Sequence, residues 1–191
     1  MILKKTNAIL SIISVLTLFI HVGYNFFAYI TFYYNPLLKV LTAIPFTIAV
    51  CLHAICGMCA VFLMGDGTAL TLYPKQNRKT ILQRISAALI FPLLIIHINA
   101  FNILKSNAEK SNTAMFILIL FLQVLFFAVI FAHTAVSFSK AFVTLGFLSN
   151  QNVQKKIDAI AIVFCAILFL ATVFAVVRGE LLMFLPLWGT L

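Results

Sequence analysis

Apolar residues fill five long stretches of the chain, and the polar residues gather in the short segments between them. Each stretch holds the ~20 residues that an α-helix needs to cross the hydrocarbon of a membrane. None shows the alternation of polar and apolar residues that a barrel strand requires, and open backbone groups cannot be satisfied in lipid. The predicted transmembrane helices are residues 7–29, 39–64, 81–104, 113–146 and 157–177. The pattern therefore predicts an all-α integral membrane protein, in which residues 1–191 form a single transmembrane domain.

Composition supports this class. Hydrophobic residues make up 64% of the chain and charged residues 9%, whereas a soluble domain carries about a quarter charged residues. The formal net charge of +9 could suggest a nucleic-acid partner. The Lys and Arg residues, however, form short clusters between the apolar stretches instead of one continuous face, so no nucleic acid is expected. The four cysteines lie inside apolar stretches and are interpreted as small buried hydrophobes.

The basic residues also predict which way the helices run. If the N-terminus is cytoplasmic, nine Lys and Arg residues flank the cytoplasmic ends of the helices and four flank the outer ends. The nine are Lys4, Lys5, Lys75, Arg78, Lys79, Arg84, Lys140, Lys155 and Lys156, and the four are Lys39, Lys105, Lys110 and Arg178. The positive-inside rule therefore predicts a cytoplasmic N-terminus and a C-terminus outside. Tyr29, Tyr33, Tyr34 and Trp188 would then form an aromatic belt at the outer interface.

The candidate functional residues of this chain are four histidines: His21, His53, His97 and His133. Each of the first four predicted helices holds one of them, and the fifth holds none. An ionisable side chain inside a membrane is costly, so by default it faces the bundle interior and has a function. Neutral imidazole is a good ligand for iron, and a haem between two helices can take one histidine from each side. The first four helices are therefore predicted to form a bundle that binds two haems b through four axial histidines.

Depth along the helices predicts how the histidines pair. Odd-numbered helices run outward and even-numbered helices run inward, so helices two apart in the chain bring like depths together. At ~1.5 Å per residue, His21 lies ~21 Å from residue 7 and His97 ~24 Å from residue 81, both nearer the outer side. His53 and His133 lie nearer the cytoplasmic side. The predicted pairs are His21 with His97 at an outer haem and His53 with His133 at an inner haem.

Three further residues are candidates for haem binding. Gly57 follows His53 by four positions on the same helical face, where a missing side chain would let a flat porphyrin approach. Close helix packing explains this glycine comparably well. Arg84 and Lys140 lie at cytoplasmic helix ends and could pair with propionates of the inner haem, although basic residues that snorkel to the interface are the alternative. The chain contains no catalytic dyad, phosphate-binding loop or nucleophile motif.

Three short motifs resemble those of one known family. Residues 84–87 (Arg-Ile-Ser-Ala), followed by His97 and isoleucine, are similar to the Arg-x-Ser-Gly and His-Ile pattern of succinate dehydrogenase cytochrome b subunits. Residues 53–57 (His-Ala-Ile-Cys-Gly) are similar to the His-x-x-x-Gly motif of that family, and residues 133–141 to a later stretch. Overall the chain resembles the single-chain, five-helix, di-haem membrane anchor of succinate dehydrogenases and fumarate reductases. The similarity of layout covers nearly the whole chain.

This resemblance implies a complex in a bacterial cytoplasmic membrane. A flavoprotein subunit and an iron-sulfur subunit would bind on the cytoplasmic side, over residues 65–79 and 149–156, and the complex could form a higher oligomer. Electrons would pass between the iron-sulfur clusters, the two haems and a membrane quinone, with menaquinone expected. The flavin would carry out the dicarboxylate chemistry. This chain would then be a quinone-reacting, electron-transferring subunit of an oxidoreductase, without a succinate site.

The chain departs from the family pattern at two places. Ala87 stands where the family often has glycine. Some related fumarate reductases also place an acidic residue near the outer haem, whereas the first two predicted helices here contain no Asp or Glu, and the nearest candidate is Glu180 near the outer end of the fifth. Two other functions remain open. One is a di-haem cytochrome b of another electron route, such as a ferric or extracytoplasmic reductase, and the other is a haem-free membrane transporter or scaffold.

Overall fold

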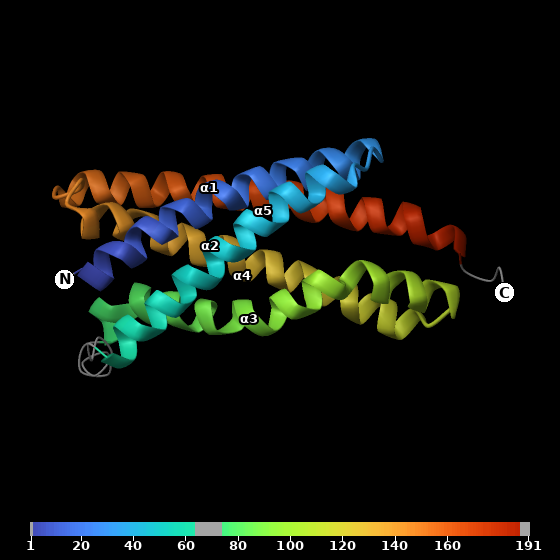
Figure 1. Cartoon of the computed structure of the whole chain (residues 1–191), viewed down its shortest axis with the longest axis horizontal. Coiled ribbons are helices and arrows are strands. Elements are labelled where there is room, and N and C mark those ends of the chain that lie inside the picture. The colour runs from blue at the N-terminus through green and yellow to red at the C-terminus, as the bar shows by residue number, and fades with distance from the viewer. Residues whose placement is uncertain (1, 64–73, 188–191) are drawn as a thin grey trace.

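A computed structural model describes residues 2–63 and 74–187 of the protein, which form a bundle of long helices (Figure 1). The helices are α1 (Ile2–Thr31), α2 (Pro36–Leu63), α3 (Pro74–Glu109), α4 (Thr113–Leu145) and α5 (Gln151–Phe184), and a short 3-10 helix follows at Leu185–Leu187. All five α-helices are long and apolar enough to cross a membrane. The predicted all-α architecture, with five helices that are long and apolar enough to span a membrane, is therefore confirmed.

α1, α3 and α5 extend beyond both ends of their apolar stretches, whereas α4 ends within one residue of its predicted bounds. α3 passes the apolar stretch 81–104 at both ends. Asn112 precedes α4, and its side-chain oxygen accepts a hydrogen bond from the backbone N–H of Met115 at 3.3 Å. Gly146 follows the last turn of α4 with a φ of 86°, a left-handed conformation that favours glycine. Hydropathy thus predicts the part of each helix that lies in lipid, whereas local capping determines the residue at which the helix ends.

The helices pack as two neighbouring pairs with α5 against both. α1 lies along α2, α3 lies along α4, and α5 packs against α4 and α1 (Figure 1). α1 also contacts α4. Within the described residues, α2 takes nearly all of its close backbone contacts from α1. The bundle therefore includes α5 as a packed member beside the first four helices, and α2 is held closely on one side only.

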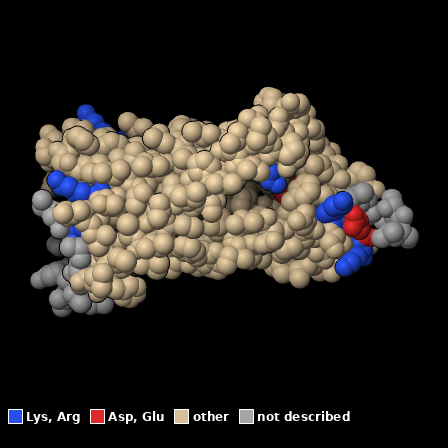
Figure 2. Space-filling model, in the orientation of Figure 1, with Lys and Arg blue, Asp and Glu red and all other residues tan. Residues whose placement is uncertain are grey.

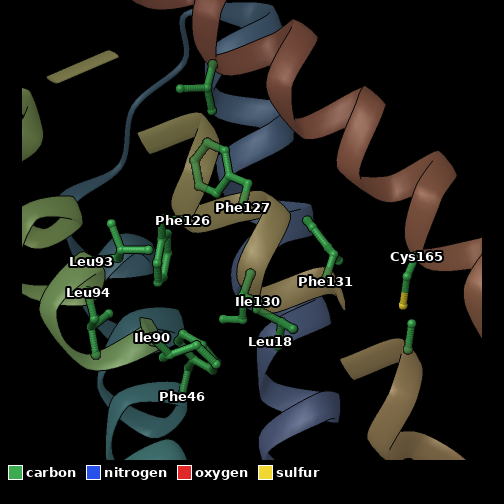
Figure 3. Packing of buried hydrophobic residues seen from close by; sticks show 12 residues of the cluster. Leu18, Phe46, Ile90, Leu93, Leu94, Phe126, Phe127, Ile130, Phe131 and Cys165 are labelled. Carbon is green, nitrogen blue, oxygen red and sulfur yellow. The ribbon is translucent and has the colours of Figure 1, made fainter. Parts of the chain in front are cut away.

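Large side chains fill the middle of the bundle (Figure 3). The main cluster draws Leu18 from α1, Phe46 from α2, Leu94 from α3, Phe126 from α4 and Cys165 from α5. Lipid is as apolar as these residues, so it is their close packing that holds membrane helices together. Phe46 is the member that α2 contributes, and it is buried. Side chains of this kind, more than backbone contact, connect α2 to the far side of the bundle.

Charged residues gather mainly at the two ends of the bundle, and the long surface between them is mostly apolar (Figure 2). Because successive helices alternate in direction, the basic residues predicted on the cytoplasmic side lie at one end, called here the basic end. Those whose side chains are described are Lys4, Lys5, Arg78, Lys79, Arg84, Lys140, Lys155 and Lys156. Which end faces the cytoplasm stays a prediction. Residues 65–73 of the predicted docking surface and Trp188 of the predicted aromatic belt lie outside the described residues.

A buried carboxyl joins three helices at the basic end. Asp158 of α5 is 7% exposed. It accepts a hydrogen bond of 2.6 Å from the Ser139 hydroxyl of α4 and forms an ion pair with Lys79 of α3. Burying a carboxylate is costly unless donors surround it, and these two side chains supply them. The sequence analysis did not single out Asp158, and the structure gives it a role in holding α5 against α3 and α4.

Removing this carboxyl is expected to destabilise the bundle more than removing its cation. In Asp158→Ala the buried hydrogen bond from Ser139 is lost, and hydrogen bonds to charged groups contribute about 1.5–3 kcal/mol. Lys79 is more than half exposed, so Lys79→Ala should cost less than about 1 kcal/mol. Denaturation of the detergent-solubilised protein would measure both changes. Equal losses for the two variants would contradict this account of Asp158.

Candidate functional site: two pairs of histidines

The structure brings His53 of α2 and His133 of α4 together. Their ring centroids lie 6.4 Å apart, with an angle of 64° between the ring planes. His53 stands ten residues before the end of α2 and His133 twelve residues before the end of α4, so both lie in the half of the bundle next to the basic end. The two helices share few close backbone contacts. The two imidazoles therefore meet across a loosely packed side of the bundle.

One nitrogen of each of these two rings is already bonded to a neighbouring helix. His53 Nδ1 lies 3.2 Å from the backbone oxygen of Asn7 in α1. His133 Nδ1 lies 3.1 Å from the backbone oxygen of Gln83 in α3 and 2.9 Å from the Ser86 hydroxyl oxygen. Carbonyl oxygens only accept hydrogen bonds, so each Nδ1 is the protonated nitrogen and each Nε2 carries the lone pair. A ring held in this way is prepared to bind a metal through Nε2.

The spacing of the two rings fits an iron between them. Imidazole nitrogens bind metals at about 2 Å, and each nitrogen lies about 1 Å from its ring centre, so two rings on opposite sides of one metal have centroids about 6 Å apart. The observed 6.4 Å agrees with that value. Among the described residues, no three His, Cys, Asp or Glu side chains cluster as a metal site. A haem iron needs only two protein ligands, so the histidine pair and not a larger cluster is the relevant group.

The predicted outer pair, His21 and His97, is arranged differently, because each ring stacks on a phenylalanine and no contact between the two rings is found among the described residues. The His21 ring stacks on Phe46 with centroids 5.5 Å apart, and its nitrogens lie 3.3 Å from the Asn25 amide nitrogen. The His97 ring stacks on Phe126 at 4.7 Å. His97 Nδ1 is buried and has no hydrogen-bond partner among the described residues. A buried imidazole nitrogen without a partner is the feature expected of a ligand atom.

The surface is hollowed near the middle of the bundle. α2 and α3 diverge away from the basic end in Figure 1, and Figure 2, in the same orientation, shows a hollow near the middle of the bundle with a basic and an acidic group beside it. Separate apolar grooves of about 300 Å³ lie along α1 and α5, next to the side chains of Phe19 and Phe164. No histidine lines these grooves.

The other three predicted haem-binding residues lie around the inner pair. Gly57 faces α1, where an added Cβ would meet only the Asn7 side chain at 3.8 Å, an ordinary contact. The Lys140 ammonium donates to the side chains of Thr80 at 3.0 Å and Gln83 at 2.9 Å. Gln83 thus holds Lys140 through its side chain and His133 through its backbone. Arg84 is half-buried one residue further along α3. The structure thus connects Lys140 to His133 through Gln83, and the haem-binding role of Lys140 and Arg84 stays a prediction.

The sequence analysis named Glu180 near the outer end of the fifth helix, but it did not predict the polar cluster that surrounds this residue. Glu180 is 1% exposed, and one of its carboxyl oxygens accepts hydrogen bonds from the Gln123 amide at 2.7 Å and the Tyr29 hydroxyl at 3.3 Å. Tyr29 therefore points into the bundle, whereas the sequence analysis predicted that it lies in the aromatic belt at the membrane interface. Gln123 was the available signal, because it is the one polar residue in the apolar run 114–132 of α4.

Comparisons with known proteins do not assign this chain. No protein family model, no curated protein and no solved structure matches it. The resemblance to di-haem membrane anchors therefore rests on the short motifs and the helix layout alone. A proposed function must therefore rest mainly on the geometry of the histidines.

Proposed function

We propose that this protein is a membrane cytochrome b that holds two haems b and transfers electrons to or from a membrane quinone. In this proposal it is the anchor subunit of a succinate dehydrogenase or fumarate reductase in a bacterial cytoplasmic membrane. A flavoprotein subunit and an iron-sulfur subunit bind at the basic end, which faces the cytoplasm. The expected quinone is menaquinone. The dicarboxylate reaction belongs to the flavoprotein subunit.

The meeting of His53 and His133 is the observation that supports this proposal most strongly. Histidines that merely filled space would not need their Nδ1 atoms bonded to carbonyls of two other helices while their rings lie 6.4 Å apart. α2 and α4 share few close backbone contacts, as expected if a flat group lies between them. The buried, unpartnered Nδ1 of His97 supports a second site in the outer half. A scaffold or transporter requires none of these features.

The chain's own residues have clear tasks in this proposal. When bound, haem supplies a carrier of single electrons, and its potential depends on its axial ligands and their hydrogen bonds. Asn7, Gln83 and Ser86 orient the two inner imidazoles, and Lys140 and Arg84 place positive charge beside the inner site. Phe46 and Phe126 pack against the outer imidazoles and keep water away from them.

A spectrum of the purified protein tests the proposal directly. With haem supplied during expression, the reduced-minus-oxidised spectrum should show b-type bands, and the extracted haem should amount to two per chain. A protein that folds in the membrane and binds no haem would refute the proposal. Co-purification with a flavoprotein and an iron-sulfur protein would support the anchor assignment. Two haems on a chain that purifies with some other redox partner would instead favour a different electron route.

A further inference from the structure

One of the two apolar grooves lies where α4 and α5 pass each other, in the half of the bundle next to the basic end. Its floor consists of short side chains that are buried, namely Thr134 of α4 and Ala161 and Cys165 of α5. Its rim consists of large side chains, of which Ile160 is 68% exposed and Phe164 is 48% exposed. Short side chains between large ones leave a hollow, and this hollow opens on the surface that lipid would cover.

This groove has the chemistry of a hydrocarbon site. The Thr134 hydroxyl, the one hydroxyl among its lining residues, donates to the backbone oxygen of Ile130 at 2.9 Å and is not left for a ligand. The groove has a volume of about 300 Å³ and follows α5 from Ile157 to Phe164, which is ~10 Å at ~1.5 Å per residue. A helix with its side chains is about 10–12 Å across. The space therefore fits a single hydrocarbon chain and is too small for a helix of another protein.

Two lysines lie where the groove begins. Lys155 and Lys156 belong to the first two turns of α5, and both are exposed. Lys156 precedes Ile160 of the rim by four positions, so the two residues are neighbours on one side of the helix. The nearest acidic residue along the chain, Asp158, is buried and forms its ion pair with Lys79. The charge of Asp158 is thus matched by Lys79, and the two lysines offer positive charge at the mouth of an apolar groove.

We propose that this groove binds one acyl chain of an anionic phospholipid, whose phosphate group lies at Lys155 and Lys156. One leaflet is about half of the ~30 Å hydrocarbon core, so a lipid at the basic end supplies enough chain to reach Phe164. Phe19 and Phe164 line both grooves and meet edge to face, with centroids 5.5 Å apart, so this pair separates the groove from the second one. Basic residues beside a recess between transmembrane helices favour a negatively charged lipid over a neutral one.

The lipid site is separate from the histidines, because none of the residues that line the groove is a histidine. The inference therefore does not rest on the proposed function. Lys155 and Lys156 also belong to residues 149–156, over which partner subunits are expected to bind, so the lipid would lie at the edge of that surface. A membrane quinone, whose tail is also hydrocarbon, and a second copy of this chain are the alternative occupants.

The first experiment measures lipid binding to the full-length chain, extracted from membranes in a mild detergent, by native mass spectrometry. The probes are phosphatidylglycerol, which is anionic, and phosphatidylcholine with the same acyl chains, which has no net charge. One phosphatidylglycerol should bind per chain, about 25-fold more tightly than phosphatidylcholine, because each lysine near an anionic lipid contributes about fivefold. Lys155→Gln with Lys156→Gln should remove most of this difference. Lys105→Gln with Lys110→Gln, which removes two exposed lysines at the opposite end of the bundle, is the matched control and should preserve it.

The second experiment fills the groove. Ala161→Phe places a ring on the floor and should weaken the binding of both lipids at least tenfold. Gly23→Phe fills the second groove, where an added Cβ meets no atom within 4 Å, and should leave the binding unchanged. If Ala161→Phe does not accumulate, Ile160→Trp replaces it, because a larger side chain on the exposed rim covers the groove without entering the core.

Several results would overturn the lipid site. Equal affinity for the two lipids, or unchanged phosphatidylglycerol binding in the variant of Lys155 and Lys156, would show that the lysines do not hold a phosphate. Unchanged binding when the groove is filled would show that the acyl chain lies elsewhere. Menaquinone that displaces the lipid and binds equally well without the two lysines would assign the groove to a quinone, and a dimer that Ala161→Phe dissociates would assign it to a second copy. A chain without haem would refute the proposed function and leave these results as they stand.

Discussion

Replacing His53 or His133 by alanine is expected to remove the same haem and leave the other in place. Each variant should keep about half of the wild-type haem, because one of the two sites loses one of its two proposed axial ligands and is weakened, while the other site is unchanged. The rings of these two residues lie 6.4 Å apart, on opposite sides of the position proposed for the iron. Low-temperature reduced-minus-oxidised spectra and haem extraction would measure the loss.

The outer histidines provide the matched control for this experiment. His21→Ala and His97→Ala should each remove the other haem and keep the one that the His53 and His133 variants lose. The double variant of His53 and His133 should match either single variant, because both residues serve one site. Protein levels must be compared alongside. If His53→Ala and His133→Ala removed different haems, the pairing proposed here would be wrong.

A second large effect is expected at Gly179, where α5 passes α1. A Cβ added to Gly179 would overlap the Tyr29 ring close to its base, where the side chain has little freedom to move. Overpacking of this kind costs about 1–3 kcal/mol. Gly179→Ala should also disturb the hydrogen bond from Tyr29 to Glu180, because it displaces the ring that makes it. Denaturation in detergent would show the loss of stability.

Gly23 of α1 supplies the control. A Cβ built at Gly23 meets no atom within 4 Å, and alanine stabilises a helix interior over glycine by about 0.5–1 kcal/mol. Gly23→Ala should therefore leave the protein as stable as wild type or make it slightly more stable. The prediction concerns the difference between the two substitutions. Loss of stability in Gly23→Ala equal to that in Gly179→Ala would show that the Tyr29 contact is not the cause.

Hydropathy predicted the five helices because lipid imposes one simple condition on every spanning segment. The same condition made the proximity of His53 and His133 predictable, since alternating helices bring residues of like depth together. The ends of the fourth helix were predicted to within one residue, whereas the first, third and fifth helices continue past their apolar runs into polar residues, which the apolar pattern does not reveal. The apolar pattern also predicted a shorter third helix than the structure shows.

The polar network of the outer half could not be derived from the sequence. Tyr29 and Glu180 are 151 positions apart, and their contact depends on how α5 is rotated against α1. A tyrosine near a helix end predicts the membrane interface, and nothing in the pattern shows that it turns inward. Asp158 was missed for a similar reason, because an acidic residue among lysines suggests a solvated helix start, whereas its burial comes from packing against α4.

The one-sided packing of α2 has a consequence for how the protein would be assembled. A helix that has a close neighbour on just one side loses few packing contacts when its other side moves away from the bundle. His53 and Phe46 then contribute much of what draws α2 towards α3 and α4. A group bound jointly by α2 and α4 would take the place of the missing interhelical contact, so its binding energy would add to the stability of the folded bundle. Cofactor supply would then set how much of the protein persists in the cell.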